Sequence, residues 1–127
     1  MGTVNASQEP GREEIESALA EASRIKQDTL SFMQAAEKAD NVFIRRNEGK
    51  PEGYTETPYG AALVGARESV DRLMIVISSL TRLQRSHATM FAADFRELLR
   101  EIERARVTLA GLGTPPDSED DDDEEED

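Results

Sequence analysis

The chain has 127 residues, the size of one small domain, and a formal net charge of −12. It contains no cysteine, which excludes disulfides and thiolate metal sites. The charge is unevenly spread: residues 1–116 carry 17 acidic and 15 basic residues, whereas residues 117–127 carry the other 10 acids. We therefore expect an electrically ordinary folded body followed by a separate acidic tail.

A long helix is predicted after a polar leader. Residues 1–11 show no apolar periodicity and end in Pro10 and Gly11, so we expect them to be disordered. Residues 12–46 contain no proline or glycine, and small or apolar residues recur there at alternating spacings of three and four. This spacing predicts one helix with a coiled-coil-like seam. The seam residues are Ile15, Ala18, Ala22, Ile25, Thr29, Phe32, Ala36, Ala39 and Phe43.

Residues 47–60, NEGKPEGYTETPYG, contain three glycines and two prolines and are predicted to be a loop. A loop of 14 residues exceeds the usual length of about 2–8 residues between bundle helices, so this segment is a candidate binding element. It carries both tyrosines of the chain, Tyr54 and Tyr59. We expect both side chains to be exposed and available to a partner.

Residues 61–112 form the second helical region. The seam resumes at Leu63, is interrupted around Gln84 and His87, and returns with a shifted spacing at Phe91. Two interpretations remain open. The region is either one continuous helix, about 75 Å long, or it bends at residues 84–88, with Ser86 capping a third helix. Weak helix formers near the interruption favour the bend.

The run LMIVI at residues 73–77 is apolar on every side of its helix, so a two-helix hairpin cannot cover it. Either a third helix or a second copy of the chain must do so. The predicted fold class is therefore all-α, as a long helical hairpin or a bent three-helix arrangement with coiled-coil-like seams. The residues predicted for helix packing or an oligomer interface are Leu63, Val70, Leu73, Met74, Ile77, Leu80, Phe91, Phe95, Leu98 and Ile102.

The sequence carries no pattern typical of catalysis. His87 is the only histidine, and the nearest acid on its helix, Asp94, lies two turns away, so we expect a packed or solvated side chain. There is no Glu-x-x-His motif, no EF-hand loop and no phosphate-binding glycine pattern. We therefore expect a non-enzymatic protein with no cofactor and no metal.

Eight arginines lie in residues 61–112, against six acids. One interpretation is a solvated surface with ion pairs three residues apart, at Glu97–Arg100, Glu101–Arg104 and Glu103–Arg106. The other is a basic strip that binds phosphate or an acidic partner. The residues predicted to bind a partner in this way, besides the two tyrosines, are Arg82, Arg85, Arg96 and Arg100.

The acidic tail follows the helical domain, which we place at residues 12–113, and occupies residues 114–127. Its like charges repel one another and bury no apolar area, which predicts disorder. It can dock on a basic protein surface in a salt-dependent manner, mask the chain's own arginines, or keep neighbouring molecules apart. Its acids are Asp117, Glu119, Asp120, Asp121, Asp122, Asp123, Glu124, Glu125, Glu126 and Asp127.

These features predict a helical protein–protein interaction or assembly subunit. We expect it to form homo-oligomers or to join a larger helical complex, with a tail that engages or screens basic surfaces. We also expect a soluble, cytoplasmic protein (nuclear is an alternative in a eukaryote), because no signal peptide is present and residues 73–77 are far shorter than the about 20 residues that span a bilayer. The alternative function is a nucleic-acid-associated regulator whose arginine strip is restrained by the tail. Sparse aromatics and the tail's negative charge make nucleic acid the less favoured partner.

Overall fold

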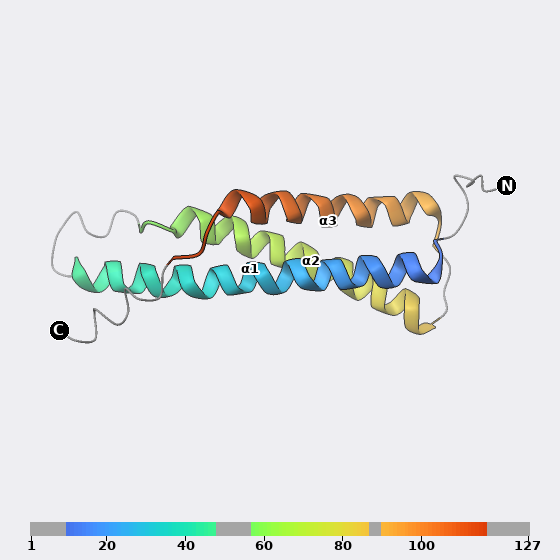
Figure 1. The fold of residues 1–127 in the computed structure, drawn as a ribbon, viewed down its shortest axis with the longest axis horizontal. Helices are drawn as coiled ribbons and strands as arrows, with labels where there is room; N and C mark the ends of the chain where they lie inside the picture. Colours follow the sequence, from blue (N-terminus) through green and yellow to red (C-terminus); the bar gives the residue numbers. More distant parts are fainter. Residues whose placement is uncertain (1–9, 48–56, 87–89, 117–127) are drawn as a thin grey trace.

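The computed structural model describes residues 10–47, 57–86 and 90–116. These residues form the helices α1 (Arg12–Arg46), α2 (Gly60–Ser86) and α3 (Ala92–Leu112), and no β-strand occurs among them. The chain runs along α1, returns along α2 and runs back along α3, so that α2 is antiparallel to both other helices (Figure 1). The predicted all-α class is confirmed in its three-helix form.

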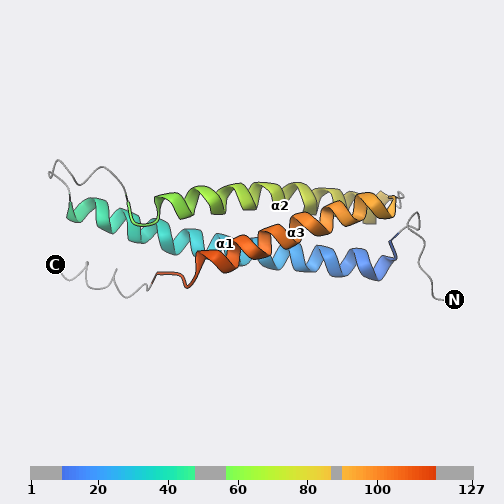
Figure 2. The ribbon, with the colours of Figure 1, turned by 90° about the horizontal axis from the view of Figure 1, so that it is seen from above.

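The third helix lies over the line where the first two meet (Figure 2). The contact between α1 and α2 is the most extensive, and α3 packs against both. One core cluster joins all three helices, with fully buried Ala22, Leu73 and Leu80 packed against Phe95 and Ile102 of α3. Small side chains on α1 allow the neighbouring helices to approach closely, so an alanine-rich face serves as one wall of this core.

Charged side chains suit both ends of α1. The backbone N–H of Gly11 donates a hydrogen bond of 2.9 Å to Oε1 of Glu14, which satisfies a donor that the helix leaves free. Arg45 and Arg46 lie in the last turn, where positive charge is favourable beside the helix dipole. Asn47 follows, and its side-chain amide donates to the Phe43 carbonyl at 2.8 Å.

The buried face of α1 follows the predicted seam as far as Ala36 and then departs from it. Thr29 is fully buried on this face, and its hydroxyl is satisfied by a 2.7 Å hydrogen bond to the Ile25 carbonyl. Near the end of α1 the buried residues are Asp40 and Val42, not the predicted Ala39 and Phe43, which are half-buried. A straight helix drifts by about 20° per heptad against a 3.5-residue spacing, so the buried stripe moves round the helix.

The break between α2 and α3 differs in detail from the predicted bend. One continuous helix is wrong, because α2 ends at Ser86 and α3 begins at Ala92. The prediction that Ser86 caps the new helix is also wrong. Its hydroxyl donates to the Arg82 carbonyl at 2.6 Å, so it closes α2, and the N-cap of α3 is Phe91. His87 lies outside the described residues.

The end of α3 is set by Gly113. Its φ of 79° lies in the left-handed region that glycine adopts without steric cost, and its N–H donates to the Ala110 carbonyl at 3.3 Å. Pro115 and Pro116 follow, and neither has a backbone N–H with which to continue the helix. The chain therefore leaves the bundle at this point.

The core predicts a sharp contrast between two alanine substitutions. Leu73→Ala should lower the free energy of unfolding by about 2–5 kcal/mol, because Leu73 is fully buried in the three-helix core. Val107→Ala on α3 is the control: Val107 is 61% exposed, and its loss should change stability by no more than about 0.5 kcal/mol. Urea denaturation followed by circular dichroism measures both, and equal losses for the two variants would contradict this packing.

Candidate functional site

The structure divides the residues predicted for packing or an oligomer interface into three groups. Five are buried inside the three-helix bundle, three are partly buried, and two are exposed. Two alternatives were predicted to cover the apolar run at residues 73–77, a third helix or a second copy of the chain, and the structure shows the third helix. The buried residues are Val70, Leu73, Leu80, Phe95 and Ile102. The partly buried ones are Leu63, Ile77 and Leu98, and the exposed ones are Met74 and Phe91.

The side of α2 that points away from the core exposes large apolar side chains. Met74 and Ile75 lie at its centre and are 51% and 67% exposed. Helical periodicity places further exposed residues on the same side, which we call the outer face of α2. The outer face consists of Val64, Arg67, Glu68, Asp71, Met74, Ile75, Ser78, Arg82 and Arg85.

The charges along this outer face are ordered. Acidic Glu68 and Asp71 precede the apolar centre, and basic Arg82 and Arg85 follow it. Arg67 also lies at the acidic end of this face, and the carboxylate of Glu37 on α1, 3.6 Å from its guanidinium, offsets part of its charge. From the N-terminal end of the outer face, acidic side chains are therefore followed by apolar and then by basic ones.

The arginines of α3 are largely neutralised within the helix. The three predicted ion pairs are present: Arg100 with Glu97, Arg104 with Glu101 at 4.0 Å, and Arg106 with Glu103. Arg106 also pairs with Glu21 of α1, so it links two helices. Arg82 and Arg85 line a shallow hollow formed by α2 alone, together with Ile77, Ser78, Thr81 and Ser86. The predicted arginines thus lie on separate surfaces.

Tyr59 is only partly exposed and has a structural role at the start of α2, contrary to the expectation of two exposed tyrosines. Its ring meets that of Phe32 edge to face, with 6.2 Å between the centroids. Its backbone N–H donates to Oδ1 of the buried Asp40 at 3.0 Å. A carboxylate from α1 therefore caps the N-terminal end of α2, where negative charge is favourable. Tyr54 and the acids of residues 117–127 lie outside the described residues.

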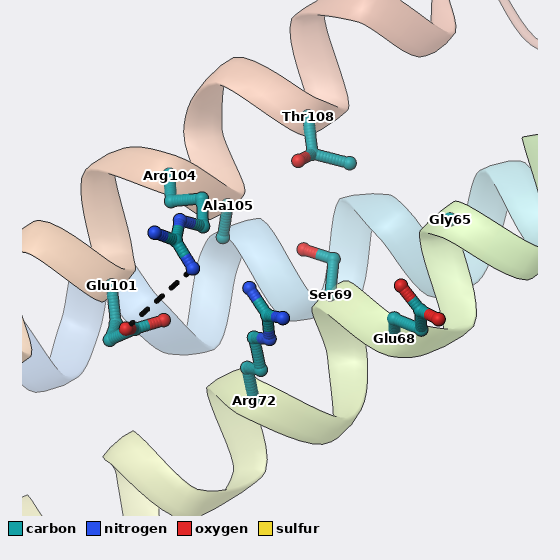
Figure 3. A pocket seen from close by; sticks show the side chains of 8 residues that line it. All are labelled: Gly65, Glu68, Ser69, Arg72, Glu101, Arg104, Ala105 and Thr108. Carbon is teal, nitrogen blue, oxygen red and sulfur yellow. Dashed lines mark ion pairs between the residues drawn. The ribbon is translucent and has the colours of Figure 1, made fainter.

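A polar pocket of about 150 Å³ lies between α2 and α3 (Figure 3). Its lining includes two oxygen atoms that are buried and have no hydrogen-bond partner in the described part of the chain, Oγ of Ser69 and Oε1 of Glu101. The guanidinium groups of Arg72 and Arg104 point toward each other across it. No spacing pattern in the sequence reveals this pocket, because its residues come from two different helices. Gly65, Glu68, Ala105 and Thr108 complete the lining.

No protein-family model, curated protein or solved structure matches this chain. Within residues 10–47, 57–86 and 90–116, no three acidic or histidine side chains are grouped so as to hold a metal ion. No helix in the same residues combines the length and apolarity needed to cross a membrane. Two surfaces of α2 are candidate sites: its outer face and the pocket that it forms with α3.

The Asp40 cap gives a testable contribution to stability. Asp40→Ala should lower the free energy of unfolding by about 1–2 kcal/mol, because the Tyr59 N–H loses its acceptor at a partly buried position. Asp40→Asn keeps an oxygen acceptor and should cost less. Asp28→Ala, at an exposed position of the same helix, is the matched control. A loss no larger than that of the control in thermal unfolding would contradict the cap.

Proposed function

We propose that this protein is a non-enzymatic helical assembly module that pairs with a second copy of itself through the outer face of α2. The observation that carries the proposal is the exposure of Met74 and Ile75 at the centre of that face, although α1 and α3 already cover the opposite side of the helix. Adjacent large apolar side chains of this kind, bordered by charges, are typical of an interaction surface.

The order of charges favours a second copy as the partner. When two identical helices pair in antiparallel orientation about Met74 and Ile75, the acidic end of each lies against the basic end of the other. Glu68 and Asp71 of one copy then face Arg82 and Arg85 of the other, while the apolar centres meet. The outer face is therefore complementary to itself in charge as well as in apolarity.

The nucleic-acid alternative has less support. Arg100, Arg104 and Arg106 each pair with a glutamate three residues earlier, so their charge is partly offset. Arg82 and Arg85 are separate from that set and belong to a surface whose other end is acidic. A duplex with its uniform negative charge would meet repulsion from that end and from the ten acids of residues 117–127.

Self-association predicts that Ile75→Asp converts a dimer into a helical monomer, because the substitution places a charge at the centre of the interface. Val107→Asp is the matched control: Val107 on α3 has a similar exposed fraction, 61% against 67%, but lies outside the outer face. Sedimentation over a range of protein concentrations measures the assembly, and circular dichroism confirms that both variants fold. A monomeric, helical wild-type chain would overturn the proposal, as would equal behaviour of the two variants.

Charge reversal tests the antiparallel orientation separately. Arg82→Glu alone should weaken the dimer, because it brings acids together at both ends of the symmetric interface. Combining it with Glu68→Arg should restore much of the lost affinity. If the double variant assembles no better than the single one, the antiparallel orientation is wrong, even if the wild-type chain self-associates.

We further propose that the acidic tail engages basic surfaces. Residues 117–127 carry ten acids in eleven positions, and such a density attracts a basic partner over a distance set by the salt concentration. This attraction requires no pocket and is independent of the α2 surface. The tail and the outer face therefore constitute two separable interaction elements.

Deleting residues 117–127 should abolish binding to poly-lysine, and raising the salt concentration should weaken the binding of the full chain, because the attraction is screened. A tail of equal length with its acids replaced by Ser and Gln controls for length. Fluorescence anisotropy with labelled poly-lysine and with a labelled DNA duplex measures both partners. If the chain instead binds the DNA duplex in a salt-dependent manner, and binds it more tightly when residues 117–127 are deleted, the result would support the nucleic-acid alternative.

A further inference from the structure

The polar pocket between α2 and α3 contains buried polar groups that the fold leaves unsatisfied. Ser69 is 7% exposed, and its hydroxyl oxygen has no hydrogen-bond partner among the described residues. The same is true of Oε1 of Glu101, whose other carboxylate oxygen lies 4.0 Å from Nη1 of Arg104. Buried polar atoms in folded proteins almost always have a hydrogen-bond partner, so we expect a ligand group to bond to both atoms.

Two guanidinium groups converge on the same pocket. Arg104 reaches it from α3 and Arg72 from α2, and in Figure 3 their ends point toward each other to the left of Ser69. Arg72 forms no ion pair with any of the described residues. Like charges repel, and a pair of guanidinium groups facing a common space suits a carboxylate, which each can bind with two parallel N–H donors.

Gly65 keeps the end of the pocket open. It lies in the interior of α2, where glycine is less favourable than alanine for the helix. A Cβ placed there would meet nothing within 4 Å, so packing against a neighbouring helix does not require glycine at this position. The space beside it belongs to the pocket. A larger side chain at residue 65 would therefore enter the pocket and leave the core unchanged.

We propose that this pocket binds a small zwitterion of the α-amino-acid class. The ligand carboxylate lies between Arg72 and Arg104 and accepts a hydrogen bond from the Ser69 hydroxyl. The ligand ammonium donates to Oε1 of Glu101, the buried acceptor without a partner. The lining carries two arginines and two glutamates, Glu68 being the second, so its formal charge is zero and matches a ligand with one charge of each sign.

The size of the pocket limits the ligand. About 150 Å³ is well below the roughly 300–1,000 Å³ of pockets that hold drug-sized molecules, so only the smallest amino acids fit. The pocket lies on the side of α2 that faces α3 and shares only Glu68 with the outer face. Ligand binding is therefore tested with variants of pocket residues that lie outside the outer face.

The test is calorimetric titration of the full chain with glycine and L-alanine, with acetate, methylammonium and inorganic phosphate as probes that lack one of the two charges. Glycine or alanine should bind at millimolar concentration, and each single-charge probe should bind at least about tenfold more weakly, because one charge-assisted hydrogen bond is lost. Failure of both amino acids to bind at about 50 mM overturns the proposal. Equal or tighter binding of acetate or phosphate also overturns it and indicates a plain anion site.

Matched variants locate the binding. Arg72→Gln should weaken amino-acid binding at least about tenfold, whereas Arg24→Gln, an equal change of charge at an exposed position of α1, should leave it unaltered. Gly65→Leu should abolish binding by filling the pocket, and Gly65→Ala should retain most of it. Circular dichroism verifies folding of each variant. Binding that survives both Arg72→Gln and Gly65→Leu would place the ligand elsewhere and refute the assignment.

Discussion

The fold depends on covering an apolar helix with an alanine-rich one. α2 carries Leu73, Val76 and Leu80, and the face that α1 offers them is made largely of small side chains. Alanines bury little area each, so two helices leave this core open on one side. α3 closes it with Phe95 and Ile102, whose side chains supply the volume that α1 lacks. The up-down-up arrangement follows from this requirement.

Because the core closes on one side of α2, the apolar side chains on the other side of this helix stay exposed. Three helices can surround only the inward half of the LMIVI run, so Leu73 and Val76 are buried whereas Met74 and Ile75 remain exposed. The apolar residues on all sides of this segment thus have two roles. The inner pair holds the bundle together, and the outer pair is the centre of the surface that we assign to self-association.

Much of this architecture could be predicted because helix periodicity is a local property of the sequence. Spacings of three and four residues marked the buried positions from Ala18 to Ala36, and weak helix formers marked the break before α3. Ile75 lay within the predicted apolar run, but the side of α2 that would stay exposed depends on where the other helices pack. Contacts between helices were missed for the same reason: Asp40 caps α2 from α1, and Ser69 of α2 and Glu101 of α3 line one pocket only because these two helices pack together.

The same topology determines where the ends of α3 would lie in the proposed dimer. Because α3 is antiparallel to α2, it ends toward the end of the bundle where α2 begins (Figure 1). Antiparallel pairing of two α2 helices, each about 40 Å long, would place the C-terminal ends of the two α3 helices at opposite ends of the assembly. Charges at those two ends would be separated by about four Debye lengths at 0.1 M salt, so their repulsion would be screened. Parallel pairing would bring both ends of α3 together, and the antiparallel orientation is also the one that the charges of the outer face require.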